Sequence, residues 1–150
     1  MADRKVLIQV PYVPSTWHKI DVMMELANPQ PGEKMVDLGS GDGRIVIAFA
    51  KKGIESHGYE INSELALLSE SKILDENLDE KAFIHIADFW EADLSSFNIV
   101  IIYGMTSIMT HLEEKLKTEL KPGSRVISAI FHFPNWEPTT QKDNVSLYCV

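Results

Sequence analysis

The chain has 150 residues, of which 45% are hydrophobic and 24% are charged, and its net charge at pH 7 is −8. This length and composition are typical of one compact globular domain and exclude a disordered chain. The negative charge opposes a nucleic-acid partner, since affinity for phosphate backbones grows with the number of lysine and arginine contacts. It favours basic partners, including proteins that present a lysine.

No apolar run approaches the roughly 20 residues that span a bilayer, and the N-terminus has no signal-peptide pattern. We therefore expect no membrane span. The lone cysteine, Cys149, cannot form a disulfide within the chain, which favours a reducing compartment. The expected location is the cytoplasm, and the sequence leaves the oligomeric state open.

The hydrophobic pattern alternates strands with helices along the chain. In chain order we expect a helix at Ile20–Ala27, a strand at Met35–Leu38, a helix at Arg44–Lys52, a strand at Ser56–Ile61, a helix from Asn62 to about Leu78, strands at Ala82–Ala87 and Asn98–Tyr103, a helix at Ser107–Leu120, and strands at Arg125–Phe133 and Val145–Val150. This order predicts an α/β fold of Rossmann-like, doubly wound type, with six to seven mostly parallel strands and helices on both faces. A single domain should span residues 1–150.

A glycine-rich loop at Asp37–Gly43 joins the first predicted strand to the next helix. Its alternating glycines let the backbone turn with positive φ and let a ligand approach closely. A dinucleotide fingerprint would require a glycine where Arg44 stands. An acid just before the turn is unhelpful to a pyrophosphate, but it suits a cofactor that carries an ammonium group and a cationic sulfur. The alternative is a purely structural strand–turn–helix corner.

Two further acids stand at the ends of the next two predicted strands. Glu60 can accept hydrogen bonds from both ribose hydroxyls, although by itself it would be an ordinary exposed glutamate. Asp88 can accept a hydrogen bond from an adenine amine while Phe89 covers the ring, or it can simply cap a helix. Because parallel strands end at one edge of a sheet, Asp37, Glu60 and Asp88 should meet there.

These residues together resemble the class I S-adenosylmethionine-dependent methyltransferases. Four segments are more narrowly similar to the protein-lysine methyltransferase family that includes the ATP synthase c-subunit and adenine nucleotide translocase enzymes, and to archaeal protein lysine methyltransferases. They are Pro11–Pro14, Asp37–Val46, Gly58–Glu60 and Phe131–Trp136. The resemblance implies methyl transfer from S-adenosylmethionine to a protein lysine.

The resemblance, with the residues above, also implies a set of cofactor contacts: Tyr12, Thr16, Asp37, Gly39, Ser40, Gly41, Glu60, Ile61, Asp88, Phe89 and Tyr103. Residues 1–20 should cover the cofactor and substrate site, with Tyr12–Thr16 folded over the methionine end. The mitochondrial members carry an N-terminal hydrophobic targeting and membrane segment that this sequence lacks, so we expect an acceptor outside the membrane. The sixth strand of the fold would have to fit within Thr139–Asp143.

Methyl transfer from a sulfonium to an amine is a direct displacement and needs no metal, and the five histidines show no ligand spacing. Holding the reactants in line can supply about 7–11 kcal/mol. The acceptor lysine must also lose its proton, which costs roughly 4–5 kcal/mol at pH 7. An aromatic-walled channel would help by excluding water, and Tyr12, Tyr103 and Trp136 are its candidate residues. Ordinary packing is the alternative role for Trp136.

Three other functions remain open. Enzymes that methylate amino groups of nucleic acids usually carry Asn/Asp-Pro-Pro-Tyr/Phe after the fourth strand, where this chain reads Tyr103-Gly104-Met105-Thr106. A small-molecule methyltransferase would usually add a lid, for which this chain has little room. A non-catalytic cofactor-binding module would keep the loop and the acids without turnover.

Overall fold

The computed structural model describes residues 15–150, so the predictions for Tyr12 lie outside the described residues. In chain order the elements are α1 (Trp17–Ala27), β1 (Lys34–Leu38), α2 (Arg44–Ala50), β2 (Glu55–Tyr59), α3 (Ser63–Asp75), β3 (Ala82–His85), the 3-10 turn η2 (Phe89–Glu91), β4 (Ile99–Ile102), α4 (Thr106–Glu119), β5 (Arg125–Ala129), β6 (Thr140–Lys142) and β7 (Val145–Cys149). Every predicted helix and strand is present, with shifted ends.

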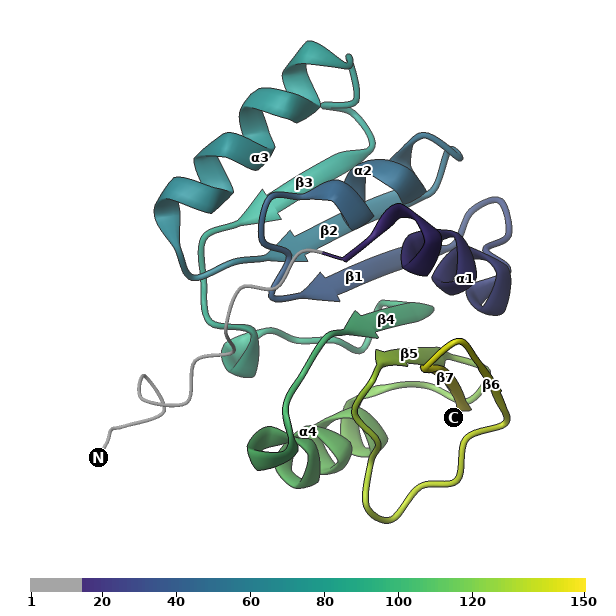
Figure 1. Cartoon of the computed structure of the whole chain (residues 1–150). Helices are drawn as coiled ribbons and strands as arrows, with labels where there is room; N and C mark the ends of the chain where they lie inside the picture. The colour runs from purple at the N-terminus through teal and green to yellow at the C-terminus, as the bar shows by residue number, and fades with distance from the viewer. Residues whose placement is uncertain (1–14) are drawn as a thin grey trace, which may run out of the picture.

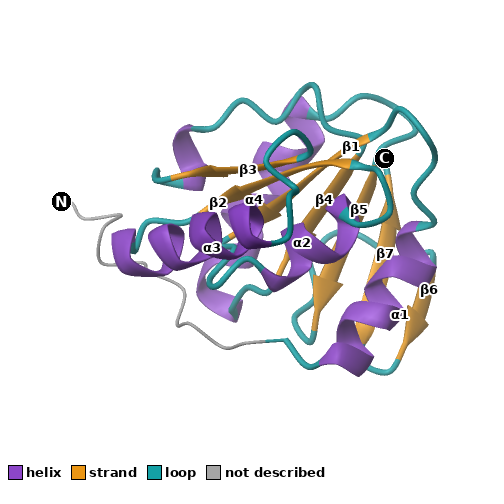
Figure 2. Ribbon diagram, turned by 90° about the horizontal axis from the view of Figure 1, so that it is seen from above, coloured by secondary structure: helices purple, strands orange, loops and turns teal. Residues whose placement is uncertain are grey.

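Within residues 15–150 the strands form one seven-stranded sheet in the order β3-β2-β1-β4-β5-β7-β6. The first five strands of this order run parallel, whereas β7 runs antiparallel to both β5 and β6. Helices α1, α2 and α3 lie on one face and α4 on the other (Figures 1 and 2). The predicted doubly wound, mostly parallel fold is confirmed. The strand order reverses between β1 and β4, and such a switch point is where open α/β sheets bind ligands.

Capping side chains set the starts of two helices. The Thr16 hydroxyl accepts a hydrogen bond from the Lys19 N–H, so α1 begins three residues before the predicted Ile20. The side chain of Asn62 accepts from the N–H groups of Glu64 and Leu65, as predicted for the start of α3. Helix α1 ends where Asn28 takes a left-handed conformation, with φ of 44°.

The strand predicted at Arg125–Phe133 is too long, because β5 ends at Ala129. Ile130 has φ of +71°, which takes the backbone out of the extended region. The short sixth strand forms at Thr140–Lys142 and joins β7 through a tight turn at Asp143 and Asn144, whose φ values are 50° and 65°. Two consecutive residues of positive φ match the right-handed twist of a hairpin.

Strands β1 and β4 are buried on both faces, which explains their nearly continuous apolar sequences. One core cluster lies beneath α4 and includes Val100, Leu112 and Tyr148. A second lies beneath α1 and α2 and includes Met23 and Phe49, and a third joins α2 to α3 through residues such as Ile73. This two-sided core fixes the ends of the central strands, from which the candidate site projects. None of the helices in the described part of the chain has the length and apolar content needed to cross a bilayer.

Candidate active site

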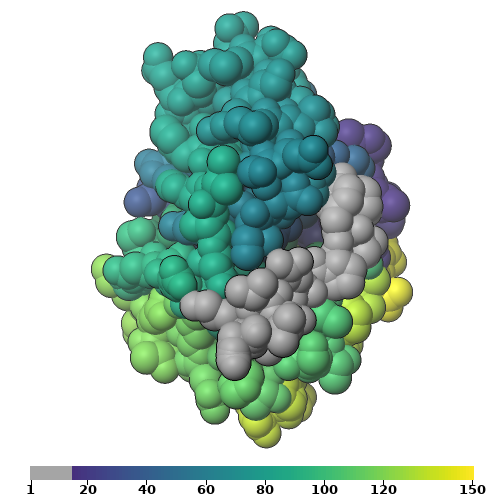
Figure 3. Space-filling model, turned by 90° about the vertical axis from the view of Figure 1, so that its left-hand side faces the viewer, coloured from purple at the N-terminus to yellow at the C-terminus, as the bar shows by residue number. Residues whose placement is uncertain are grey.

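The glycine loop connects β1 to α2 at the carboxyl edge of the sheet, and Figure 3 looks onto this edge. The N–H groups of Gly39 and Ser40 both donate to the carbonyl of Tyr59, at 2.8 and 3.0 Å, which ties the loop to β2. Gly39 has φ of +83°, and a Cβ placed there would meet no atom within 4 Å. Gly43 also has φ of +83°, but a Cβ there would come within 2.8 Å of the Ser69 hydroxyl. Gly43 thus lets α3 pack closely, whereas Gly39 leaves open space for a ligand.

Asp37 lies near the end of β1 and is only 3% exposed. Among the described residues no side chain forms an ion pair with it, and its charged neighbours are the carboxylates of Glu60 and Asp42. Burial is the main cause, and these two negative charges the second, of a pKa for Asp37 well above the ordinary value. A cationic ligand group beside Asp37 would relieve both effects.

Glu60 is held in place directly after β2. One carboxylate oxygen accepts from the N–H of Gly41 at 2.7 Å, and the other accepts from the N–H of Asn62 at 2.9 Å. Each carboxylate oxygen has a further lone pair, so Glu60 can still accept hydrogen bonds from ligand hydroxyls. Its position beside the loop supports the predicted ribose contact.

Asp42 has a different role from Asp37, although both belong to the loop. Burial acts to raise the pKa of Asp42, but the hydrogen bonds and charge of Arg44 and the charge of Lys72 outweigh it and lower the pKa to about 2. The Arg44 guanidinium lies 2.7 Å from the Asp42 carboxylate and also donates to the carbonyl of Ser15. Asp42 therefore stabilises the turn and ties it to the start of α1.

The third acid, Asp88, caps the turn η2, because its side chain accepts from the N–H of Trp90 at 3.0 Å. The structure therefore confirms the capping alternative for Asp88. This bond uses Oδ1, which leaves Oδ2 of the carboxylate for a ligand. Ile61 follows β2 and is 47% exposed, and its contact with the cofactor stays a prediction. Ile86, directly after β3, is likewise exposed, at 51%.

The structure brings Tyr103 together with Phe131 rather than with Trp136. The rings of Tyr103 and Phe131 lie 6.4 Å apart at 65°, after β4 and β5 respectively. Trp136 instead packs against Phe133 and Tyr148, with its ring 5.2 Å from the Lys117 ammonium of α4. These contacts match the packing alternative for Trp136, and its acceptor role stays a prediction. Phe131 was missed because it was assigned to the interior of a longer strand.

Three predicted cofactor contacts are placed by the structure in different surroundings, and the buried hydroxyl of one of them, Ser40, has no hydrogen-bond partner among the described residues. Thr16 caps α1 through its hydroxyl. Ser40 is buried with its side chain against Gly58, where an added Cβ would lie 2.5 Å from the Ser40 hydroxyl oxygen. Phe89 is half-buried and packs against the core beneath α4. Contacts of these three side chains with a cofactor stay predictions.

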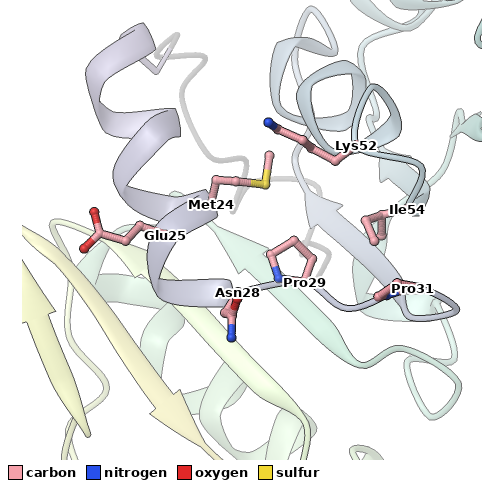
Figure 4. Close-up of a pocket in the computed structure, with 7 residues that line it drawn as sticks. All are labelled: Met24, Glu25, Asn28, Pro29, Pro31, Lys52 and Ile54. Carbon is pink, nitrogen blue, oxygen red and sulfur yellow. The ribbon is translucent and has the colours of Figure 1, made fainter.

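A surface pocket of about 470 Å³ lies at the opposite edge of the sheet (Figure 4). It is bordered by α1, by the loop before β1 and by the loop before β2, through Met24, Glu25, Asn28, Pro29, Pro31, Lys52 and Ile54. Because ligands of open α/β folds bind at the carboxyl edge, this pocket is separate from the candidate site. In residues 15–150 no three histidine, cysteine or acidic side chains are grouped so that they could hold a metal ion.

The fold and the site define the class: a class I methyltransferase fold, whose cofactor is S-adenosylmethionine. The residues present fit this group. Asp37, a buried acid without a cationic partner among the described residues, suits the positively charged amino-acid end of the cofactor. Glu60, which two backbone N–H groups hold in place, suits its ribose, and Gly39 leaves open space beside the loop.

Comparison with known proteins gives the family. The model of the ANTKMT methyltransferase domain matches residues 37–140. The human lysine N-methyltransferase of the ATP synthase c-subunit is 41% identical over 135 residues, which are 90% of this chain and 57% of that protein. A protein-lysine N-methyltransferase of Saccharolobus islandicus is 36% identical over 131 residues, 86% of this chain and 81% of that protein. The chain belongs to the ANTKMT methyltransferase family.

A solved structure agrees with this assignment. The crystal structure of an RNA methyltransferase from Salinibacter ruber, in complex with S-adenosyl-L-homocysteine, has a TM-score of 0.85 and 31% sequence identity, covering 91% of both chains. The chain spans little more than half the length of the vertebrate relatives that it matches.

Proposed function

We propose that this protein transfers a methyl group from S-adenosylmethionine to the ε-amine of a lysine in another protein. The observation that carries the proposal is the 36% identity to the Saccharolobus protein-lysine N-methyltransferase across most of both chains. The glycine loop and the acids that follow the strands lie in the part of the chain that the family model covers. The human relative, which is named for lysine methylation of an ATP synthase component, supports the same reaction type.

The chain's own residues supply binding, charge and exclusion of water. When bound, S-adenosylmethionine would supply an electrophilic methyl group, with S-adenosylhomocysteine as the leaving group. The acceptor lysine would first give up a proton to water, so that its neutral amine can form the new N–C bond. The Asp37 carboxylate balances the positive charge of the cofactor, and Glu60 orients its ribose. The half-buried rings of Tyr103 and Phe131 remove water from the lysine stem, which lowers the pKa of the amine and favours the neutral nucleophile. Positioning the amine in line with the methyl group accounts for most of the remaining rate enhancement.

We also propose that the protein acts in the cytoplasm. Its single cysteine, Cys149, is exposed, and a free surface thiol is compatible with a reducing compartment. Immunofluorescence of the tagged protein in its host, with markers for each compartment, tests this proposal.

A second acceptor class, RNA, is favoured by one observation: the similar Salinibacter structure is that of an RNA methyltransferase. Two features of this chain oppose it. The net charge of −8 disfavours binding to phosphate backbones. The segment after β4, Tyr103–Thr106, also lacks the asparagine and prolines that grip a flipped base.

Radiolabelled S-adenosylmethionine, incubated with the purified protein and a host lysate, tests the proposal directly. We expect label on discrete protein bands, which mass spectrometry identifies as methyllysine. The variants Asp37→Ala and Glu60→Ala should lose cofactor binding in calorimetry and should leave those bands unlabelled. Asp79→Ala, at an exposed acid before β3, is the matched control and should behave as the native protein does.

Each contrary outcome has a clear meaning. Label confined to RNA or to small molecules would overturn the lysine proposal while leaving the fold intact. Unchanged cofactor affinity in both the Asp37 and the Glu60 variant would show that the cofactor site is assigned wrongly.

A further inference from the structure

The chain leaves β5 through a tight turn at Ala129–Phe131. The N–H of Phe131 donates to the carbonyl of Ala129 at 2.8 Å, which closes a three-residue γ-turn with Ile130 at its centre. Ile130 has φ of +71°, and a γ-turn with positive φ is rare and strained. The N–H of Ile130 donates to the carbonyl of Asn144 at 2.7 Å, so the turn is anchored to the β6–β7 hairpin.

Isoleucine is conformationally unfavourable at a backbone position with positive φ. Glycine adopts positive φ without strain, whereas a β-branched residue there is an outlier. In residues 15–150 the other non-glycine residues with positive φ are asparagine or aspartate, which tolerate it: Asn28, Asn77, Asp143 and Asn144. Ile130 is the exception, and such an outlier points to a role for its side chain beyond the turn itself.

The fold does not use this side chain as core. Ile130 is 41% exposed, whereas the neighbouring β5 residues Ser128 and Ala129 are fully buried. The Ser128 hydroxyl donates to the carbonyl of Phe131, which fixes the turn from within. An exposed, strained and apolar residue is thus held rigidly at the surface.

The turn lies beside the candidate acceptor position. The register pairs Ile102 of β4 with Ser128 of β5, so both strands end together at the carboxyl edge (Figure 1). Tyr103 packs against the core cluster beneath α1 and α2, whereas Phe131 packs against the cluster beneath α4. Their ring contact therefore bridges the end of the sheet between its two faces, with Ile130 next to it in the chain.

We propose that Ile130 is a specificity-determining residue of the acceptor site, beside a channel wall made by Tyr103 and Phe131. The aromatic pair receives the aliphatic stem of the acceptor lysine. Ile130 contacts an apolar side chain adjacent to that lysine, so the protein selects lysines with an apolar neighbour over lysines with a polar one. This inference rests on the proposed lysine methyl transfer.

The variant Ile130→Gly tests the inference, because glycine fits the positive φ and should keep the turn and the fold. Two peptides that differ only in leucine or serine beside the lysine are the acceptors. We expect the native protein to prefer the leucine peptide roughly tenfold in kcat/KM, as for one apolar contact in a binding pocket. Ile130→Gly should lose this preference through a higher KM for the leucine peptide, with kcat and the affinity for S-adenosylhomocysteine unchanged.

Two further variants show whether a lost preference comes from the missing Ile130 side chain or from a change in the turn. Leu74→Ala removes an exposed apolar side chain on α3, far along the chain from the turn, and should preserve the preference. Ile130→Asn also tolerates positive φ and should lose the preference as the glycine variant does, which keeps the test valid if glycine loosens the turn. An Ile130→Gly variant that still selects the leucine peptide would overturn the inference while lysine transfer continued. A native protein that methylates RNA and neither peptide would overturn the proposed function and the inference together.

A separate experiment tests the channel wall made by Tyr103 and Phe131. Tyr103→Ala should lower kcat/KM for both peptides by a larger factor than it weakens binding of S-adenosylhomocysteine, and Tyr103→Phe should restore transfer because it keeps the ring. A loss of cofactor affinity as large as the loss of kcat/KM in Tyr103→Ala would place this residue in the cofactor pocket alone and would overturn its role in the wall.

Discussion

Asp37 and Asp42 belong to the same glycine loop but have opposite electrostatic surroundings. Asp42 is paired with Arg44 and Lys72, so it is ionised and stabilises the turn. Asp37 is more deeply buried, and the charged groups that shift its pKa are both negative. A buried charge without a partner is costly, so ionised Asp37 destabilises the folded protein when no cofactor is bound. A cationic ligand beside Asp37 would offset this cost.

The pH dependence of stability should reveal this cost. The raised pKa means that folded, cofactor-free protein keeps a proton on Asp37 where the unfolded chain has lost it. The contribution of protonated Asp37 to the free energy of unfolding is therefore fully present below the unfolded pKa of about 3.8. It is lost as the pH rises from there toward the folded pKa. Asp37→Asn cannot ionise, so it should lack this decline and be at least as stable as the native protein at neutral pH.

Urea unfolding midpoints of both proteins, measured from about pH 4 to about pH 8, check this expectation. Asp42, whose pKa is about 2 in the folded protein, is present in both proteins, so its contribution to the pH dependence cancels in the comparison. Parallel curves for the native protein and Asp37→Asn would show that Asp37 has an ordinary pKa.

At the scale of elements, helix α1 is held to the sheet by Arg125 at the start of β5. Its guanidinium donates to the carbonyl of Ala27 at 3.0 and 2.7 Å and forms two 2.8 Å bonds to Glu33. The last carbonyls of a helix have no partner within it, so Arg125 supplies one. The hydrogen bond from Arg125 is the main cause of the lowered pKa of Glu33.

Arg125→Met keeps much of the apolar stem but removes these bonds, and it should reduce the free energy of unfolding by about 2–3 kcal/mol. Urea unfolding provides the measurement. Lys142→Met is the matched control, since it breaks an exposed ion pair with Glu25 and should leave the urea midpoint unchanged. Equal losses in the two variants would mean that the Arg125 contacts contribute no more than a surface ion pair.

At the scale of the whole molecule, the net charge of −8 attracts positively charged acceptors over distance. Salt screens such attraction, since the Debye length falls from about 10 Å at 0.1 M to about 3 Å at 1 M. Raising the salt concentration should therefore increase KM several-fold for a lysine peptide with basic flanks, with little change in kcat. A peptide with acidic flanks should show no such increase, and identical salt responses for both peptides would exclude long-range attraction.

The order of the helices and strands and the glycine loop were predictable because they depend on local patterns. The apolar runs of β1 and β4, the cap at Asn62 and the glycines before α2 each act within a few residues of the chain. The three acids could be placed at one edge because parallel strands end together. The sequence alone therefore determined the fold class, the family resemblance and the edge that holds the site.

Only the tertiary structure decided how side chains distant in the chain are combined. It ended β5 at Ala129, just before Ile130, whose N–H donates to the carbonyl of Asn144. It also paired Phe131 with Tyr103 and packed Trp136 against Phe133. It also separated Asp42, paired with Lys72 of α3, from Asp37, which faces like charges. These contacts depend on strand register, on burial and on residues far apart in the chain. Patterns within a few neighbouring residues do not predict them.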